Sequence, residues 1–306
     1  MAHTFQKTFK LKDLPYLLKD TFNRWMASDP WRLSAIIAYY SILSLPGLLV
    51  IIINVIGAIW GTEIVEGELT KQISEALGSD AATSIQTMIT ETQNSDRNLW
   101  STIVGIATLL FGATGVFYQL QISLNDVWDI EMIPGSDFKN ILISRARGFA
   151  FILVVGFLLL VSLMVSASIS ILNNYIQKIF PDIVLYAAYI IDLCLSLAII
   201  SALFSLMFKY LPNAKIPWKS VWSGGFLTAV FFVIGQSLLG LYFTKADPGS
   251  TYGAAGTVVL ILLWVSYSCL ILFFGAQFTW VYAKHYTIDI TPTDHARIKL
   301  NKQTQT

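Results

Sequence analysis

The side chains of this chain that are best suited to carry chemistry are ionisable groups inside long apolar segments. Asp192 lies about nine residues into an apolar run, which is roughly 14 Å along a helix that rises 1.5 Å per residue. A carboxyl at that depth of a bilayer is costly and usually faces a cavity, a partner or a proton path. We predict a transport role for Asp192. The alternative is a neutral carboxyl that hydrogen-bonds to a Ser, Tyr or Asn of a neighbouring helix, because desolvation favours the protonated form.

Amide and phenol side chains occur in the same kind of segment and are predicted to line a polar path together with Asp192. This predicted set comprises Asn54, Gln236, Gln277, Tyr39 and Tyr40. Amides also hold transmembrane helices together, so each member has a structural alternative. A bundle with such an interior favours transport over simple membrane anchoring.

The residue patterns of soluble catalysis are missing from the sequence. The three histidines fall in terminal segments, and no metal-binding or nucleotide-binding motif occurs. Cys194 and Cys269 lie in apolar runs, where cysteine usually behaves as a small hydrophobe. Basic residues are spread along the chain rather than gathered in one stretch, which disfavours nucleic-acid binding. We predict no catalytic residue, no cofactor, no metal and no nucleic-acid partner.

Six apolar runs must position these residues. Hydrophobic residues make up 55% of the 306-residue chain and charged residues 13%, against about 25% charged in soluble domains. Each run reaches the roughly 20 helical residues that cross a hydrocarbon core. Pro46 is expected to bend the first run. We predict an all-α polytopic protein with one six-helix transmembrane domain over 33–282. The runs are 33–60, 99–120, 148–172, 183–208, 221–243 and 255–282.

Lysine and arginine alternate in abundance between successive connecting segments. Sixteen of the 20 basic residues fall in the arm 1–32, the loops 125–147 and 209–219, and the tail 283–306. The positive-inside rule then places both termini in the cytoplasm. The first 30 residues lack the apolar core of a cleavable signal peptide, so the first run is expected to direct membrane insertion.

The arm 1–32 is predicted to form an amphipathic helix. Asp13 stands where an N-cap would lie, Pro15 fits a first turn, and Asp29-Pro30 should end the helix. Two placements are open. The helix either lies in the membrane interface or packs against the cytoplasmic ends of the spans.

The segment 61–98 is the largest extramembrane segment and is strongly acidic. It holds seven acidic and two basic residues. Apolar positions repeat at helical spacing on both sides of Gly78-Ser79, so we predict two amphipathic helices that cover the outer end of the bundle. The acidic residues either form a solvated face or bind a cationic group or an envelope protein.

Four blocks in chain order carry a family resemblance over nearly the whole chain. They are Ala38-Tyr39-Tyr40 with Leu43–Pro46, Phe111–Gly115 with Gln119, Gln121, Asn125 and Trp128, Leu211-Pro212-Asn213, and Tyr252–Gly256 through Trp264 to Gly275-Ala276. In these blocks the chain resembles the YihY/BrkB family of bacterial inner-membrane proteins. The resemblance implies six helices, an inner-membrane location, and transport of a lipid or a small solute. Gln119 joins the predicted cavity set, and Gly112, Gly115, Gly253 and Gly256 are predicted to allow close helix packing.

The chain departs from the family pattern at three positions, the first being Gly47, where the family often has a second proline. Gln277 stands where the family usually has Glu, and Trp280 where it often has a basic residue. A charge-dependent role of that glutamate would therefore be absent here. The family's older ribonuclease label finds no supporting residues in this sequence. The leading hypothesis is a transporter or lipid-translocating protein, and the alternative is an envelope scaffold that binds partners through 61–98.

Overall fold

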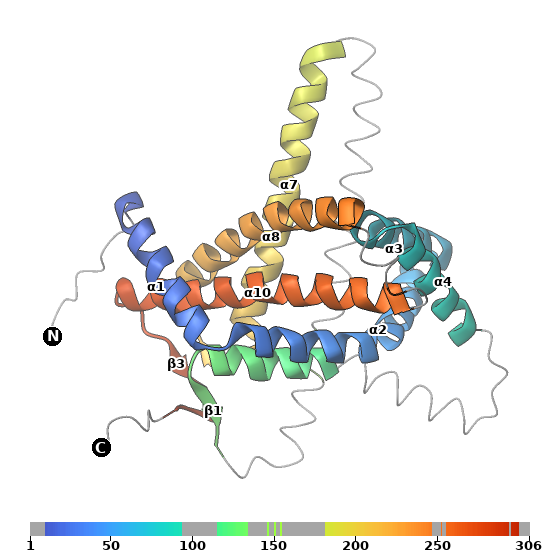
Figure 1. Ribbon diagram of the computed structural model, residues 1–306. Helices are drawn as coiled ribbons and strands as arrows, with labels where there is room; N and C mark the ends of the chain where they lie inside the picture. The colour runs from blue at the N-terminus through green and yellow to red at the C-terminus, as the bar shows by residue number, and fades with distance from the viewer. Residues whose placement is uncertain are drawn as a thin grey trace.

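Long helices make up most of the chain in the computed structural model, which describes residues 10–93, 115–133, 181–246, 255–293 and 295–299, with residues 146, 150, 154 and 252 (Figure 1). The N-terminal half contains α1 Leu14–Ala27, α2 Pro30–Trp60, α3 Thr62–Leu77 and α4 Ser79–Gln93, followed by a helical segment over 115–127. The C-terminal half contains α7 Pro181–Tyr210, α8 Trp218–Ala246 and α10 Gly256–His285.

The predicted apolar runs correspond closely to helices wherever the structure describes them. In the described part of the chain, three helical stretches are long and apolar enough to cross a membrane: Leu193–Tyr210, Trp218–Phe243 and Gly256–His285. The first run is also helical, and α2 continues unbroken across Pro46. The third run lies outside the described residues apart from isolated positions. The protein is therefore a mainly helical membrane protein.

The end of the second run differs from its prediction. Helical residues continue to residue 127 rather than stopping at 120, so Asn125 lies on the helix and not in the loop after it. The extra turn packs inside the protein: Leu124 is fully buried, and Val127 nearly so. Tertiary burial therefore extends this helix past the stretch that hydropathy alone identified.

The all-α prediction is wrong in one respect, because the tail pairs with two loops in short antiparallel ladders. Strand β1 Ile130–Met132 pairs with β4 Ala296–Ile298, and β2 Ala214–Lys215 pairs with β3 Thr291–Pro292. Strands of two or three residues carry no readable alternation, which is why the sequence did not indicate them. The ladders hold the tail against the segments that follow residue 127 and α7.

The two ends of the bundle carry different segments (Figure 1). At one end α1 meets the last turn of α10, where the Tyr286 hydroxyl donates to Asp13 Oδ2 at 2.9 Å. At the other end α4 meets the first turn of α10, where the Ser84 and Thr257 hydroxyls share a hydrogen bond of 3.2 Å. We call these the tail end and the α4 end. The described parts of the arm, the tail and the two loops that were predicted to share one compartment lie at the tail end.

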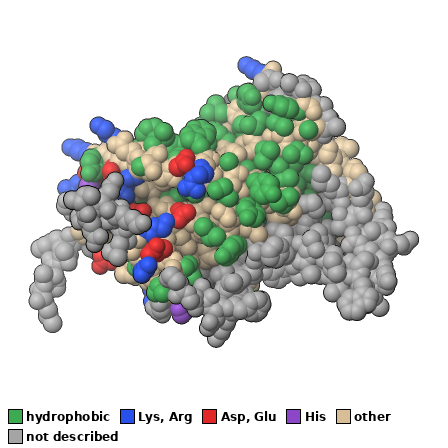
Figure 2. Space-filling model, turned by 60° about the horizontal axis from the view of Figure 1, so that its bottom comes forward, with side chains coloured by type: hydrophobic (Ala, Val, Ile, Leu, Met, Phe, Trp, Pro, Cys, Tyr) green, Lys and Arg blue, Asp and Glu red, His purple; other side chains and the backbone are tan. Residues whose placement is uncertain are grey.

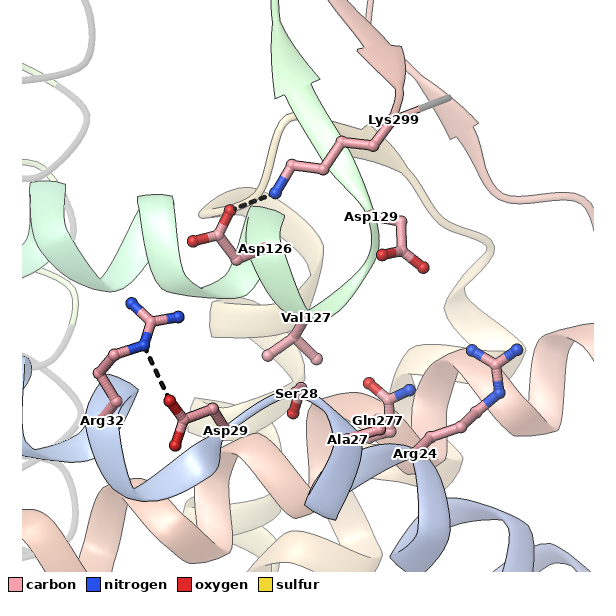
Figure 3. A pocket seen from close by; sticks show the side chains of 10 residues that line it. All are labelled: Arg24, Ala27, Ser28, Asp29, Arg32, Asp126, Val127, Asp129, Gln277 and Lys299. Atoms are coloured by element: carbon pink, nitrogen blue, oxygen red, sulfur yellow. Dashed lines mark hydrogen bonds and ion pairs between the residues drawn. The ribbon is translucent and has the colours of Figure 1, made fainter. Parts of the chain in front are cut away.

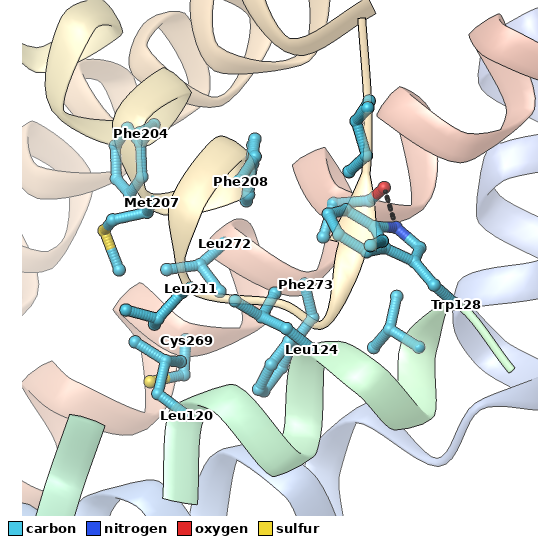
Figure 4. Packing of buried hydrophobic residues seen from close by; sticks show 14 of the residues in the cluster. Leu120, Leu124, Trp128, Phe204, Met207, Phe208, Leu211, Cys269, Leu272 and Phe273 are labelled. Atoms are coloured by element: carbon cyan, nitrogen blue, oxygen red, sulfur yellow. Dashed lines mark hydrogen bonds between the residues drawn. The ribbon is translucent and has the colours of Figure 1, made fainter. Parts of the chain in front are cut away.

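A buried cluster at the tail end joins the 115–127 segment to α7 and α10 (Figure 4). Phe208 and Phe273 are fully buried in it. The Trp128 ring packs edge-on to Phe208, with centroids 6.4 Å apart, and its Nε1 donates to the Ala276 carbonyl at 2.8 Å. A buried indole with a satisfied N–H adds both area and orientation to a core.

Glycines allow α8 to lie directly against its neighbours. Gly224 and Thr228 of α8 face Gly275 and Thr279 of α10, and a Cβ added at either glycine would overlap the opposing threonine hydroxyl. Gly225 faces α7, where an added Cβ would lie 2.9 Å from the Ser201 carbonyl oxygen. Small residues four apart are a common means of close helix approach in membranes.

Helix α1 is amphipathic as predicted and packs onto the end of α10. Leu17 is fully buried against Tyr282 and Tyr286. Asp13 precedes the helix, but its side chain makes no capping bond and instead accepts the Tyr286 hydroxyl. Asp13 therefore stands at the N-cap position as predicted, but its carboxylate bonds to a tertiary donor rather than to the backbone amides of α1. Of the two placements left open, the structure shows packing against a span.

Candidate functional site

A charged cavity of about 480 Å³ lies at the tail end, where the α1–α2 junction, the end of the 115–127 segment, α10 and the tail meet (Figure 3). Its volume falls within the range of about 300–1,000 Å³ that is usual for small-molecule sites. The residues that line it are Arg24, Ala27, Ser28, Asp29, Arg32, Asp126, Val127, Asp129, Gln277 and Lys299.

The junction between α1 and α2 forms one wall of this cavity. Asp29 adopts a left-handed backbone conformation with φ of +52°, which ends α1 and lets α2 begin at Pro30. Aspartate tolerates this region better than most residues. Its carboxylate pairs with Arg32 at 3.0 Å, one turn into α2. The break predicted at Asp29-Pro30 is therefore real, and it positions charged side chains around the cavity.

The turn after residue 127 forms the opposite wall. Asp129 is also left-handed, with φ of +54°, and its carbonyl accepts the Lys299 backbone amide at 2.7 Å. Lys299 Nζ pairs with Asp126 Oδ1 at 2.6 Å. Asp29 and Asp129 are two of the three non-glycine residues with positive φ in the part of the chain that the structure describes. Such conformations concentrate at functional sites.

Gln277 supplies the floor of the cavity from α10. The residue is only 3% exposed, and its side-chain oxygen Oε1 is buried without a hydrogen-bond donor among the described residues. Leaving a buried polar atom unpaired costs about 1–3 kcal/mol, so the arrangement calls for a compensating role. A ligand donor that entered the cavity would satisfy this atom.

Arg24 is held beside the cavity by an aromatic ring. Its guanidinium carbon lies 3.8 Å from the centroid of the Trp280 ring, one helical turn from Gln277 on α10. Stacking on an aromatic face fixes the guanidinium plane and leaves its N–H edges available for oxygen ligands. Trp280 therefore acts as a positioning residue for Arg24.

The charges of the cavity divide into paired and unpaired groups. Three basic and three acidic side chains line it, so its formal charge is zero. Arg32 pairs with Asp29, and Lys299 pairs with Asp126. Within the described residues, Arg24 and Asp129 form no ion pair. Figure 3 shows Arg24, Gln277 and Asp129 on one side of the cavity and the Arg32–Asp29 pair on the other.

Charged side chains gather at the tail end of the molecular surface as well. Figure 2 shows basic and acidic side chains clustered toward that end, with hydrophobic side chains over much of the remaining described surface of this face. Exposed apolar side chains of α8 include Phe226, Ile234, Leu238 and Leu241. Large apolar exposure of this kind suits helices that contact lipid.

Among the members of the predicted cavity set whose side chains the structure describes, Gln277 alone lines this cavity. Tyr39, Tyr40 and Gln236 have exposed side chains on α2 and α8, and Gln119 is half-buried on the 115–127 segment. None of these four is among the lining residues. Asp192, Asn54 and Pro46 lie on described helices, but their side chains are outside the described part of the structure. Their roles stay predictions.

The predicted close-packing glycines are only partly within the described chain. Gly115 and Gly256 are buried, whereas Gly112 and Gly253 lie outside the described residues. Gly224 and Gly225, which no sequence pattern singled out, make the close contacts between helices described above. Gly224 lies four residues from Thr228, and Gly225 lies 20 and 24 residues from Ser205 and Ser201 of α7, so these spacings became meaningful only once α8 was placed against its neighbours.

The resemblance blocks contact one another in the structure, although their sequences do not reveal what they do. The Asn213 backbone amide donates to Asn125 Oδ1 at 2.8 Å, and Trp128 reaches Ala276. These bonds join the second, third and fourth blocks beneath the cavity. The sequence did not indicate Arg24 and Asp129 as site residues, because isolated charged residues next to helix breaks are common. The available signal was the pair of aspartates at chain reversals.

The end of α10 also carries a perturbed tyrosine. Burial raises the pKa of the Tyr286 hydroxyl, and its hydrogen bond to Asp13 raises that pKa further. His285 Nε2 lies 3.8 Å from the same Asp13 carboxylate. This contact fastens α1, and with it Arg24, to the helix that carries Gln277.

Comparisons with known proteins find a family of bacterial membrane proteins. The sequence model of the virulence factor BrkB family matches residues 21–298. A UPF0761 membrane protein of Pseudomonas paraeruginosa is 29% identical over 64% of this chain and 45% of its own length. A UPF0761 membrane protein of Haemophilus influenzae is 25% identical over 80% of this chain and 87% of its own. A Bacillus subtilis protein, named ribonuclease-like protein YfkH, is 23% identical over 85% and 92%.

The extent of these matches differs between relatives. The chain spans 40% of the length of a relative from Verminephrobacter eiseniae and 45% of the Pseudomonas protein, but most of the Haemophilus and Bacillus proteins. No solved structure matches the chain.

Proposed function

The chain belongs to the virulence factor BrkB family of membrane proteins, and we propose that it transports a lipid or a small polar solute across the bacterial inner membrane. The cavity at the tail end is the proposed binding site for the polar part of the substrate. The unpaired, buried Gln277 oxygen in a charged cavity carries this proposal.

The position of the cavity suits a substrate that approaches from the membrane. It lies at the end of α10, next to an amphipathic helix that packs on that end. Helix ends stand at the level of lipid headgroups in a bilayer, where polar and apolar contacts are both available. The distribution of basic residues favours the cytoplasmic side of the membrane for this end. A headgroup could therefore enter the cavity while its acyl chains stay among the spans.

Reconstituted full-length protein tests the proposal directly. Fluorescent lipids in one leaflet of a liposome are quenched from outside, and the fraction that becomes accessible reports translocation. We expect wild-type protein to accelerate this exchange and Gln277→Leu to slow it about tenfold, which corresponds to losing one polar contact of roughly 1.4 kcal/mol. Gln236→Leu, which removes an exposed amide from α8, is the matched control and should leave the rate unchanged.

Stability measurements separate function from folding in this experiment. Replacing a buried unpaired acceptor with an apolar group of similar size should be neutral or stabilising. We therefore expect Gln277→Leu to unfold at the same temperature as wild type or above it. Wild-type liposomes that exchange lipid no faster than protein-free liposomes would contradict lipid translocation. Transport could also be coupled to protons through Asp192, and Asp192→Asn, assayed with and without an imposed pH gradient, tests this coupling.

The α3–α4 pair favours a second candidate function, the binding of an envelope partner. Val65, Ala81 and Ile85 are buried against the bundle, while Glu63 and Thr87 remain exposed. Because burial ties this pair to the bundle, surface variants are safer than deletion. Glu63→Lys with Thr87→Arg should leave lipid exchange unchanged if the protein is a transporter, and should abolish capture of a partner if it is a scaffold.

The proposed function does not include the ribonuclease activity that the name of the Bacillus relative suggests. His285 lies against Asp13 and Tyr16 at the end of α10, and His295 lies on the exposed tail. We propose that the chain is not an enzyme. Purified protein incubated with RNA should show no cleavage.

A further inference from the structure

The unpaired charges of the cavity point to a specific class of ligand. Of six charged side chains, four neutralise one another in two ion pairs. The remaining cation, Arg24, and the remaining anion, Asp129, stay without an ionic partner in the described chain. A ligand that completes this arrangement must bring one negative and one positive group.

We propose that the cavity binds a zwitterionic headgroup with one phosphate and one primary ammonium group. The phosphate lies on the Arg24 guanidinium, and the ammonium lies between the Asp129 carboxylate and the Gln277 side-chain oxygen. The assignment rests on the proposed function for its biological role, but binding can be measured without transport.

Arg24 suits the phosphate because its geometry is already fixed. Its plane stacks on Trp280 at 3.8 Å, so fewer side-chain rotations are lost when a ligand binds. A guanidinium can offer two parallel N–H bonds to phosphate oxygens. Arg32 and Lys299 are less available, because carboxylates occupy them at 3.0 and 2.6 Å.

Gln277 and Asp129 suit an ammonium that carries hydrogen atoms. Both present oxygen acceptors, and the Gln277 oxygen is buried without a donor. A primary ammonium has three N–H donors, whereas a quaternary ammonium has none. Quaternary ammonium groups are instead held by aromatic cages. The lining residues include no aromatic side chain, so this site favours the primary ammonium.

A purely anionic headgroup fits less well for an electrostatic reason. Its phosphate could reach Arg24, but Asp129 would then face it without a compensating cation. Like charges that are brought together in a partly desolvated site cost affinity. The cavity and its ligand together stay electrically neutral only when the ligand's own charges cancel.

Short-chain lipids that dissolve in water allow the selectivity to be measured on purified full-length protein. Isothermal titration would compare dihexanoyl phosphatidylethanolamine with the phosphatidylcholine and phosphatidylglycerol analogues. Glycerophosphoethanolamine tests the free headgroup. We expect the ethanolamine lipid to bind about tenfold more tightly than either analogue, the difference expected from one charge-assisted contact. Binding of the ethanolamine lipid alone identifies a membrane substrate, and comparable binding of glycerophosphoethanolamine identifies a soluble one.

Two variants assign the contacts. Asp129→Asn keeps a residue that tolerates a left-handed backbone, removes the charge, and should lower ethanolamine-lipid affinity about tenfold with little effect on the glycerol lipid. Arg24→Gln should weaken both. Lys284→Gln is the matched control, because Lys284 Nζ lies 4.8 Å from the same Trp280 ring but does not line the cavity.

Three results would overturn the assignment: equal affinity for the choline or glycerol lipid, unchanged ethanolamine affinity in Asp129→Asn, or no binding of either ethanolamine ligand. Selective binding without lipid exchange would instead remove the transport function and leave the ligand class standing.

Discussion

The tail end and the α4 end of the bundle are built in different ways. At the tail end, polar contacts join residues far apart in sequence, including Asp13 to Tyr286, Glu131 to Arg297 and Asp126 to Lys299. At the α4 end, apolar side chains such as Val65, Ala81 and Ile85 are buried against the bundle, and the Ser84 hydroxyl shares a hydrogen bond with Thr257. The tail end is thus constrained by many directional bonds.

This difference indicates which end of the bundle is suited to a specific binding site. A binding site needs side chains held by a supporting shell of packed and hydrogen-bonded neighbours. Arg24, Asp129 and Gln277 have such support from Trp280, the β1–β4 ladder and the buried cluster around Trp128. Contacts between apolar side chains, as at the α4 end, have no fixed direction and are easier to rearrange. We infer that recognition belongs to the tail end and that larger movements, where transport needs them, belong to the α4 end.

The largest change in stability is expected from a test that compares two glycines of α8. Gly225 lies near the tail end of α8, where an added Cβ would be 2.9 Å from the Ser201 carbonyl oxygen and the Ser205 amide nitrogen. Gly240 lies toward the other end of α8, with no neighbour within 4 Å of an added Cβ. Gly225→Ala should destabilise the protein by about 3 kcal/mol through overpacking. Gly240→Ala should be neutral or stabilise it by up to about 1 kcal/mol.

Thermal unfolding of both variants in the same detergent measures this difference. Equal unfolding temperatures for Gly225→Ala and Gly240→Ala would show that the close α7–α8 approach at the tail end does not hold in solution. Ligand binding to the cavity should remain measurable in Gly240→Ala, since that position is remote from the lining residues.

Much of the fold was readable from sequence because transmembrane helices follow from local hydropathy. The runs that became α2, α7, α8 and α10, and the break at Gly78, needed only neighbouring residues to be recognised. The β1–β4 ladder was not readable, because Glu131 and Arg297 are paired across most of the chain.

The cavity was harder to predict than the helices. Hydropathy draws attention to polar residues in apolar runs, and Gln277 was found in this way. Arg24 and Asp129 belong to segments where charge is ordinary, and only tertiary placement makes them neighbours of Gln277. Asp13 was recognised as the residue before α1, but the donor that it serves comes from Tyr286, far along the chain.

A middle-sized effect is expected from the bond that fastens α1 to α10. Tyr286→Phe removes the hydroxyl that donates to Asp13 at 2.9 Å, and should cost about 1 kcal/mol near neutral pH. Because the pKa of Tyr286 is raised in the folded protein, its neutral form stabilises the fold below the ordinary tyrosine pKa of about 10. That contribution should be lost as the pH rises through the folded-state pKa.

Denaturation of wild type and Tyr286→Phe across pH 7 to about 11 measures this bond, since the range brackets the ordinary tyrosine pKa. The difference in unfolding free energy should be constant at the lower pH values and shrink at the alkaline end. A difference that grows with pH would contradict the assigned role of the hydroxyl. Tyr252→Phe, on an exposed tyrosine outside the bundle contacts, serves as the control.

The smallest effect is expected at the α4 end. Ser84→Ala removes one partner of the hydrogen bond to Thr257, at a site that is only partly buried. Water can replace the lost partner there, so the expected destabilisation is about 0.5 kcal/mol. Hydrogen exchange of α4 should quicken more than that of α1, because the bond constrains α4 locally. If Ser84→Ala destabilised the protein as strongly as Tyr286→Phe, the α4 end would be as firmly constrained as the tail end, and the assignment of movement to it would fail.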